Sequence, residues 1–192
     1  MAAAVRNAAR LAVAPRSDNR LPLIRDAAAR FFSEKGFGYT SMRDIAGLAG
    51  MLPGSLYYHF ASKEDLLVAV YAEGVRRIKA AVAPALAREG DAWTRLENAC
   101  AAHLEALLED SDYGQVVIRV RPDDAPEVAP RLIALRDEYE QTFSQAIQAL
   151  PLPPRTDRRV LRLMLLGALN WSQTWYRSGG DSPQVLARRF VR

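Results

Sequence analysis

Apolar residues recur every three or four positions along most of this chain, the spacing of amphipathic α-helices. Ser111 to Pro122 is less regular and fits a short helix or an extended piece; a short helix is favoured because its surroundings are helical. The pattern predicts an all-α protein of about nine helices. The longer ones are expected over Leu21 to Lys35, Lys63 to about Arg88, after Asp91 to about Glu109, Ala125 to Leu150, Thr156 to Arg177, and after Ser182.

Two of the expected helices are short and closely spaced, between Thr40 and Lys63. Ser41 can cap the first helix by accepting a backbone N–H, and Asp44 three residues later sits near the positive helix end. Gly50 stands where a helix stops and a left-handed residue is needed. Pro53 has its φ already set for the first turn of a second helix, which runs to about Phe60. The stretch is therefore predicted to be a helix-turn-helix.

In a helix-turn-helix the second helix lies in the DNA major groove. Here that helix exposes Ser55, Tyr57, Tyr58 and His59, whose hydrogen-bonding groups suit phosphates and base edges. A purely structural helical hairpin shares the same glycine turn. DNA binding is the favoured interpretation of the two.

The charge distribution agrees with DNA binding. The 192 residues carry a net charge of +4, with 49% hydrophobic and 25% charged residues, as in ordinary globular proteins. Residues 1–63 hold nine Lys and Arg against four Asp and Glu, whereas residues 64–192 hold seventeen against eighteen. The basic excess therefore lies wholly in the part that contains the helix-turn-helix, as expected of a chain that docks on phosphate with one end.

The stretch Ile24 to Leu67, with DAAARFFSEKGFGYTSMRDIAGLAG followed by GSLYYHFASKEDLL, resembles the DNA-binding domain of the TetR family of bacterial repressors. The most specific part is LYYHF-x-SKE-x-L. The resemblance implies an all-helical homodimer that binds a palindromic double-stranded DNA operator. It also implies release from the operator when a small ligand binds the larger C-terminal domain.

The same resemblance assigns roles to single residues. Tyr57, His59 and Lys63 would contact phosphates, Ser55 and Tyr58 would lie against the DNA, and Arg43 would reach a base from the preceding helix. Leu52 departs from the family, which often has a Ser or Thr cap at that position. The remaining members of the expected DNA-binding surface are Thr40, Ser41, Pro53 and Gly54.

Three parts of the chain are distinguished by composition. Residues 1–19 contain three arginines and no acid before Asp18. This composition has three interpretations, ranked from the most to the least favoured: a plain flexible tail, a basic arm along DNA, and a targeting peptide. Residues 20–66 are expected to form the DNA-binding domain, and residues 67–192 the ligand-binding and dimerisation domain.

Thr156 to Arg177 is the most apolar of the expected helices, with apolar residues around much of its circumference. Such a helix is covered on more than one side. The helix-turn-helix favours a dimer interface over a monomer core as the second cover, because such proteins generally read two half-sites. The expected dimer contacts are Leu161, Leu165, Leu186 and Phe190.

The segments QVVIRV (Gln115 to Val120) and NWSQTWYRSGG (Asn170 to Gly180) resemble a TetR subgroup with repressors of fatty-acid and sterol catabolism, whose effectors are acyl-CoA thioesters. This implies a small hydrophobic or acyl-CoA effector. Trp171 and Trp175 would line its cavity or else fill the core or dimer interface. Arg119 and Arg121 would hold its anionic head or else lie on the surface.

Other classes of protein have little support. His103 and Cys100 are three apart on a helix, but two ligands do not make a metal site, so His103 is expected in the core or lining a pocket. No phosphate loop, catalytic triad or Gly-rich cofactor turn is present, so neither an enzyme nor a bound cofactor or metal is expected. The single cysteine and the lack of an apolar membrane-spanning run predict a cytoplasmic protein that makes no membrane contact. The alternative function is an architectural DNA-binding protein that needs no ligand.

Overall fold

The computed structural model describes residues 20–109 and 111–192, and these form an all-helical structure, as predicted. The basic stretch 1–19 lies outside the described residues. Three short 3₁₀ turns, η1 (Pro122–Asp124), η2 (Pro126–Val128) and η3 (Ser172–Thr174), interrupt the helical order. The α-helices are α1 (Arg20–Lys35), α2 (Met42–Leu48), α3 (Pro53–His59), α4 (Lys63–Leu86), α5 (Ala92–Leu108), α6 (Asp112–Arg119), α7 (Ala129–Gln148), α8 (Arg158–Trp171) and α9 (Pro183–Val191).

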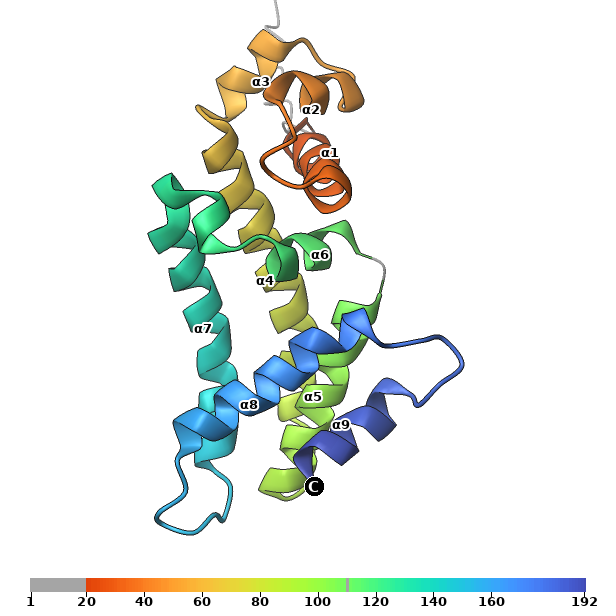
Figure 1. Cartoon of the computed structure of the whole chain (residues 1–192), viewed down its shortest axis with the longest axis vertical. Helices are drawn as coiled ribbons and strands as arrows, with labels where there is room; N and C mark the ends of the chain where they lie inside the picture. Colours follow the sequence, from red (N-terminus) through yellow and green to blue (C-terminus); the bar gives the residue numbers. More distant parts are fainter. Residues whose placement is uncertain (1–19, 110) are drawn as a thin grey trace, which may run out of the picture.

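The helices form an elongated molecule with α1, α2 and α3 at one end (Figure 1). α4 starts at that end and runs into the larger part, where it packs against α5, α6 and α7. α8 lies across this part and contacts α5 and α7, while α9 packs along α5. α4 is therefore shared by both ends of the molecule.

Local sequence signals set the helix ends in the α1–α3 unit. Ser41 caps α2 in a reciprocal capping box with Asp44, as predicted. Gly50 has φ +65, which confirms the left-handed residue expected after α2. Ser62 accepts the backbone N–H of Asp65 at the start of α4. These ends follow from residues within four positions of one another.

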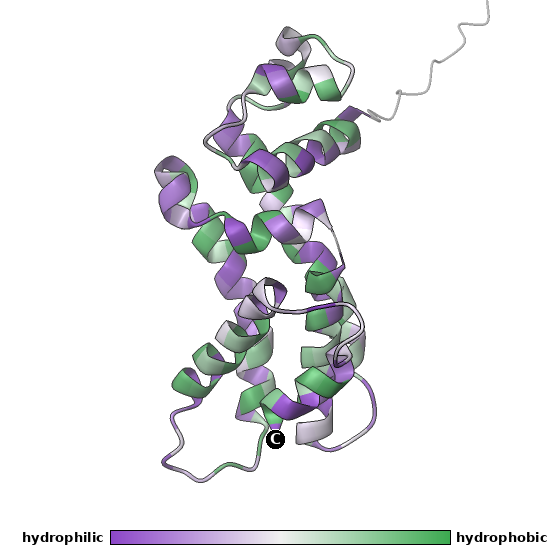
Figure 2. Cartoon of the chain, turned by 45° about the vertical axis from the view of Figure 1, so that its right-hand side comes forward, coloured by the Kyte–Doolittle hydropathy of each residue, from purple (hydrophilic) through white to green (hydrophobic). Residues whose placement is uncertain are grey.

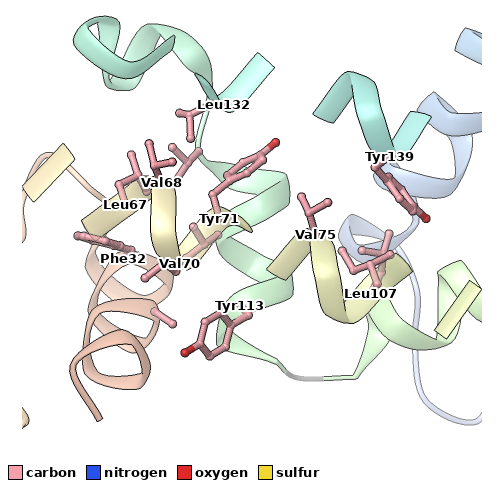
Figure 3. Packing of buried hydrophobic residues seen from close by; sticks show 14 of the residues in the cluster. Phe32, Leu67, Val68, Val70, Tyr71, Val75, Leu107, Tyr113, Leu132 and Tyr139 are labelled. Carbon is pink, nitrogen blue, oxygen red and sulfur yellow. The ribbon is translucent and has the colours of Figure 1, made fainter. Parts of the chain in front are cut away.

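A single hydrophobic core runs through the molecule. In Figure 3, Phe32 of α1 lies beside Leu67 and Val70 at the start of α4, and Val75 and Leu107 lie on the side of Tyr139. Figure 2 shows apolar ribbon recurring between polar stretches along the long helices, the pattern of faces turned inward and outward. Cys100 belongs to this core, and burial raises the pKa of its thiol to about 12.

The expected helix Thr156 to Arg177 is shorter than predicted. α8 ends at Trp171, where the buried Ser172 hydroxyl donates to the carbonyl of Leu169 at 2.7 Å and the chain turns into η3. The backbone N–H of Tyr176 then donates to the Ser172 carbonyl at 2.8 Å. A helix of 14 residues replaces the longer one expected.

The less regular stretch before α7 also has a clear structure. Residues 112–119 form the short helix α6, so the favoured interpretation is confirmed. The long helix expected from Ala125 begins only at Ala129, because Pro122 and Pro126 each open a 3₁₀ turn first.

Candidate nucleic-acid interface and ligand cavity

α2 and α3 are held together by a small buried cluster. Ile45 and Ala46 of α2 and Leu56 of α3 are fully buried, and the backbone N–H of Met51 donates to the Ala46 carbonyl at 2.8 Å across the turn. Packing at these positions fixes the angle between the two helices. It turns the opposite side of α3 to solvent.

Hydroxyl-bearing aromatic side chains dominate that outer side. Tyr58 is 87% exposed and Tyr57 is also exposed, so both hydroxyls can reach a ligand outside the protein. Leu52, which stands at the N-cap of α3, makes no side-chain cap, in keeping with its departure from the resembled pattern. Of the other expected DNA contacts, Ser41, Arg43, Pro53 and Gly54 are exposed and Ser55 and His59 are partly buried.

Two expected DNA contacts are turned inward instead. Thr40 is buried, and its hydroxyl donates to the carbonyl of Gly36 at 2.9 Å. The Lys63 ammonium donates to the carbonyls of Phe37 at 2.9 Å and Thr40 at 3.0 Å. These hydrogen bonds hold the loop between α1 and α2. Both side chains therefore support the loop in this structure, which replaces the DNA contact expected of the buried Thr40, while the phosphate contact expected of the partly buried Lys63 stays a prediction.

Ser41 is both the cap of α2 and an exposed residue. Its hydroxyl donates to an Asp44 carboxylate oxygen at 2.6 Å and its backbone N–H donates to the same oxygen at 3.1 Å, and these bonds lower the pKa of the Asp44 carboxyl. The residue is exposed as well.

Sequence reasoning missed Tyr39, which is 88% exposed in the same loop; only its position two residues before the predicted cap pointed to it.

A cavity of about 220 Å³ lies in the larger part of the molecule, between α4, α5, α6, α7 and α8. Most of its wall is apolar. The polar lining groups differ in burial: His103 and Tyr139 are buried and Asn170 is partly buried, whereas Arg121 and Arg136 are exposed and Glu140 is partly buried. The apolar lining is Tyr71, Val75, Ile78, Leu107, Val117, Ile118, Val120, Pro122, Leu132 and Leu166.

A larger hollow of about 430 Å³ follows the outer side of α4 and α5. Its lining is rich in alanine, together with exposed charged side chains such as Arg88 and Glu105. The cavity between the five helices is the better candidate for a ligand, because it combines apolar walls with a few converging polar groups.

His103 is the centre of the inner polar group. Its Nδ1 lies 2.5 Å from the Tyr139 hydroxyl and its Nε2 lies 2.9 Å from the Asn170 side-chain oxygen. The two rings of His103 and Tyr139 are stacked with centroids 5.7 Å apart. Burial lowers the pKa of His103 to about 4, so the ring is neutral at pH 7. His103 therefore lines a pocket, one of the two places in which it was expected.

The other expected ligand contacts are divided by the fold. Arg121 lines the cavity. Arg119 lies outside the lining, and its guanidinium makes a long hydrogen bond of 3.4 Å to the Ser33 carbonyl of α1. Trp171 is 67% exposed and Trp175 stacks edge-on against Phe190, so neither tryptophan lines the cavity. For both tryptophans the cavity-lining alternative is therefore wrong, which leaves the core or the dimer interface, and Arg119 does not meet this cavity.

Asn170, at the start of the segment NWSQTWYRSGG, does line the cavity. Sequence reasoning missed Asn170 and Arg136 as lining residues, and it missed that the Tyr139 hydroxyl is one of the polar groups there. An amide inside an otherwise apolar helix was the available signal for Asn170. Tyr139 was placed only in the apolar stripe of its helix.

The expected dimer contacts are also rearranged. Leu165 is only 6% exposed and Leu186 is buried too, so both pack inside the protomer, while Leu161 and Phe190 are partly buried. A different face of α8 is apolar and open: Met164 is 68% exposed, and Val160, Leu163 and Trp171 are exposed beside it at helical spacing. The apolar surface available to a partner is therefore this second face, and the expected role of Leu165 and Leu186 is corrected.

Two further findings concern the described residues alone. None of their helices is both long and apolar enough to cross a membrane. No three of their His, Cys, Asp or Glu side chains gather as a metal would require.

Comparison with known proteins identifies relatives over most of the chain. Residues 24–70 match the family described as bacterial regulatory proteins, tetR family, and residues 89–192 match a tetracyclin repressor-like C-terminal domain. The HTH-type transcriptional repressor KstR2 of Mycobacterium tuberculosis is 30% identical over 189 residues, which cover 93% of this chain and 92% of KstR2.

Solved structures share the fold. AibR, in a complex with isovaleryl coenzyme A and operator DNA, superimposes with a TM-score of 0.76 at 22% identity over 90% of this chain and 96% of its own. The superantigen PfiT superimposes with a TM-score of 0.77 at 28% identity over 91% of this chain and 95% of its own. The same fold therefore occurs in a protein solved with operator DNA and in one described as a superantigen, so the fold alone does not determine the function.

Proposed function

Because the chain belongs to the TetR family of bacterial regulatory proteins, we propose that it is a transcriptional repressor that binds a palindromic operator as a homodimer and is released by a small hydrophobic effector. The curated relative KstR2 is a transcriptional repressor. This function places the protein in the cytoplasm, with DNA, a second copy and the effector as its partners. It requires neither an enzymatic reaction nor a cofactor.

One observation carries the proposal: α4 belongs to the helix-turn-helix end and to the wall of the cavity. Its first residue, Lys63, holds the loop before α2, while Tyr71, Val75 and Ile78 farther along line the cavity. A ligand that moves this helix also moves the support of α2 and α3. A DNA-binding protein without a ligand has no use for such a cavity.

The DNA contact is assigned to α3 and the start of α2. Exposed Tyr57 and Tyr58 suit phosphate and groove contacts, and exposed Arg43 suits a base edge. A second copy doubles these contacts on a palindrome, and the open apolar face of α8 is the surface for it. Mutual burial of Met164, Val160 and Trp171 stabilises such a dimer.

The effector is assigned to the cavity, with an acyl-CoA as the first class to test. The short segments QVVIRV and NWSQTWYRSGG support this class, and AibR, which shares the fold, was solved with isovaleryl coenzyme A. Arg121 at the cavity is placed to meet an anionic head. The apolar walls suit the acyl group.

Fluorescence polarisation tests the proposal directly. Genomic fragments enriched by binding to the protein supply the labelled operator, and acyl-CoA thioesters of different chain length are then titrated into the complex. We expect tight, salt-dependent binding to a palindrome and release by at least one thioester. Binding to all sequences alike, unaffected by any ligand, identifies an architectural protein instead. Failure to bind any DNA refutes the regulator altogether.

A further inference from the structure

The cavity is small for a ligand-binding site. A cavity of about 150 Å³ holds a benzene ring, and typical ligand pockets begin near ~300 Å³. At about 220 Å³, this cavity takes a group of roughly nine non-hydrogen atoms by the same proportion. It has no room for a long acyl chain, and most of a coenzyme A thioester must remain outside.

The inner polar group limits the chemistry further. We call His103, Tyr139 and Asn170 the polar floor of the cavity; the three side chains share two hydrogen bonds. A neutral histidine has one N–H donor and one acceptor nitrogen, a tyrosine hydroxyl can donate and accept, and an amide has both kinds of group. With the Asn170 oxygen accepting from Nε2–H, Nδ1 must accept from the Tyr139 hydroxyl.

This arrangement leaves the Asn170 NH₂ as a donor and the Tyr139 oxygen as an acceptor. The opposite tautomer with a rotated amide leaves the Tyr139 O–H as a donor and the Asn170 oxygen as an acceptor. Either way, the floor offers one donor and one acceptor. Within residues 20–109 and 111–192, neither side chain has another hydrogen-bond partner for them.

A purely hydrocarbon group in this cavity covers the free donor and acceptor with nothing to bond them. Leaving buried polar groups unpaired is costly, whereas a ligand hydroxyl can pair with both groups and a keto oxygen can accept from the donor. Arg121 and Arg136, both exposed, also line the cavity. Arg136 and Arg162 both approach Glu140, at 3.6 Å and 2.7 Å, whereas the guanidinium of Arg121 makes no ion pair among the described residues.

Resting on the effector role proposed above, we propose that the effector is a thioester or acid of a short acyl group with a hydroxyl or keto oxygen at its inner end. A hydroxyl there bonds to both Asn170 and Tyr139, and a keto oxygen accepts from whichever of the two is the donor. The anionic remainder leaves the cavity past Arg121. The acyl group has roughly nine non-hydrogen atoms.

Calorimetry with matched ligands tests this chemistry. Hexanoyl-CoA and 5-oxohexanoyl-CoA differ by one oxygen at the inner end, and dodecanoyl-CoA tests chain length; the matching free acids separate the acyl group from the coenzyme. The intact protein should bind 5-oxohexanoyl-CoA about tenfold or more tightly than hexanoyl-CoA, the range set by one donor that the keto oxygen pairs and hexanoyl-CoA leaves unpaired. Dodecanoyl-CoA should bind weakest.

Variants of the polar floor make the test specific. The preference for the keto ligand should fall toward one in whichever of Tyr139→Phe and Asn170→Leu removes the donor. Tyr176→Phe and Asn98→Leu are the controls, because these partly buried residues lie outside the cavity lining; both should keep the preference. Circular dichroism of each variant confirms the fold, and Asn170→Ala, which also removes the amide donor, replaces Asn170→Leu if that variant does not fold.

Three results overturn the inference: equal binding of hexanoyl-CoA and 5-oxohexanoyl-CoA, a preference that survives in both floor variants, or tightest binding of dodecanoyl-CoA. Operator release, measured beside binding, separates this inference from the proposed function. Hexanoyl-CoA or dodecanoyl-CoA that releases the operator as well as the keto ligand leaves the repressor standing and removes only the polar-floor chemistry. If no thioester or acid binds, acyl ligands are removed both from this inference and from the proposed function.

Discussion

Lys63 offers the sharpest test of the helix-turn-helix unit, because the family resemblance and the structure assign it different roles. The resemblance assigns it a phosphate contact. In the structure its ammonium donates to the Phe37 and Thr40 carbonyls and lies 4.2 Å from the centre of the Phe37 ring. Lys63→Met keeps the length of the side chain and removes these polar contacts.

Hydrogen bonds to a charged group contribute about 1.5–3 kcal/mol each when buried, but Lys63 is only partly buried. We therefore expect Lys63→Met to lower the unfolding free energy by roughly 2 kcal/mol in total. For a protein of 192 residues, this corresponds to a fall of roughly 4–8 °C in Tm. Lys79→Met is the control: Lys79 makes an exposed ion pair with Glu138, worth at most about 1 kcal/mol.

Thermal unfolding at fixed protein concentration measures Tm, and operator binding at several salt concentrations measures the salt dependence of binding. A supporting role predicts lower Tm with an unchanged salt dependence in the folded protein. A phosphate contact predicts the reverse: unchanged Tm and a salt slope reduced by about one. The second pattern refutes the assignment made from the hydrogen bonds.

Three other predictions test the remaining assignments. Arg43→Ala should lose roughly 1–3 kcal/mol at a single operator position, and an equal loss on random DNA makes Arg43 a backbone contact instead. Met164→Glu should sediment as a monomer with an intact fold, whereas Leu165→Glu should unfold because it buries a charge inside the protomer; a dimeric Met164→Glu places the interface elsewhere. The pKa of His103 is lowered from 6.5 to about 4, so the unfolded chain binds the extra proton and stability should fall as pH falls from 6.5 toward 4. His103→Gln should lack this part of the fall in pH-dependent unfolding; an identical profile refutes the buried neutral ring.

The parts of the fold that could be predicted from the sequence depend on short-range interactions. Ser41 and Asp44 are three residues apart, and the left-handed conformation of Gly50 is a property of one residue. The ends of α2, the turn and α3 follow from such signals. The inward Lys63 could not be predicted in this way, because its partners Phe37 and Thr40 lie 26 and 23 positions away in the chain.

The cavity depends on interactions that the sequence pattern does not contain. His103 meets Asn170 67 positions away and Tyr139 36 positions away, and the pairing exists only because α5, α7 and α8 cross at this point. The choice of face on α8 is a similar case. Leu165 and Met164 are neighbours in an apolar helix, and a rotation of about 100° per residue separates the core face from the open one.

α6 connects the two ends of the molecule in addition to α4. Its C-terminal half lines the cavity with Val117 and Ile118, while its first residues bond to α1: Asp112 accepts from the Ser33 hydroxyl at 2.5 Å, and the Tyr113 hydroxyl donates to Asp26 at 2.7 Å.

α4 restricts the movement of α6 from the other side. At Gly74 an added Cβ would lie 2.6 Å from Val117 and 2.7 Å from the Tyr113 carbonyl, so the two helices touch through backbone. A helix that is bonded to α1 and packed against α4 without a gap cannot shift as a ligand enters unless one of these neighbours moves with it or the bonds to α1 break. If one neighbour moves with α6, the position of α1, which packs against α2, changes relative to α4, which follows α3 directly in the chain.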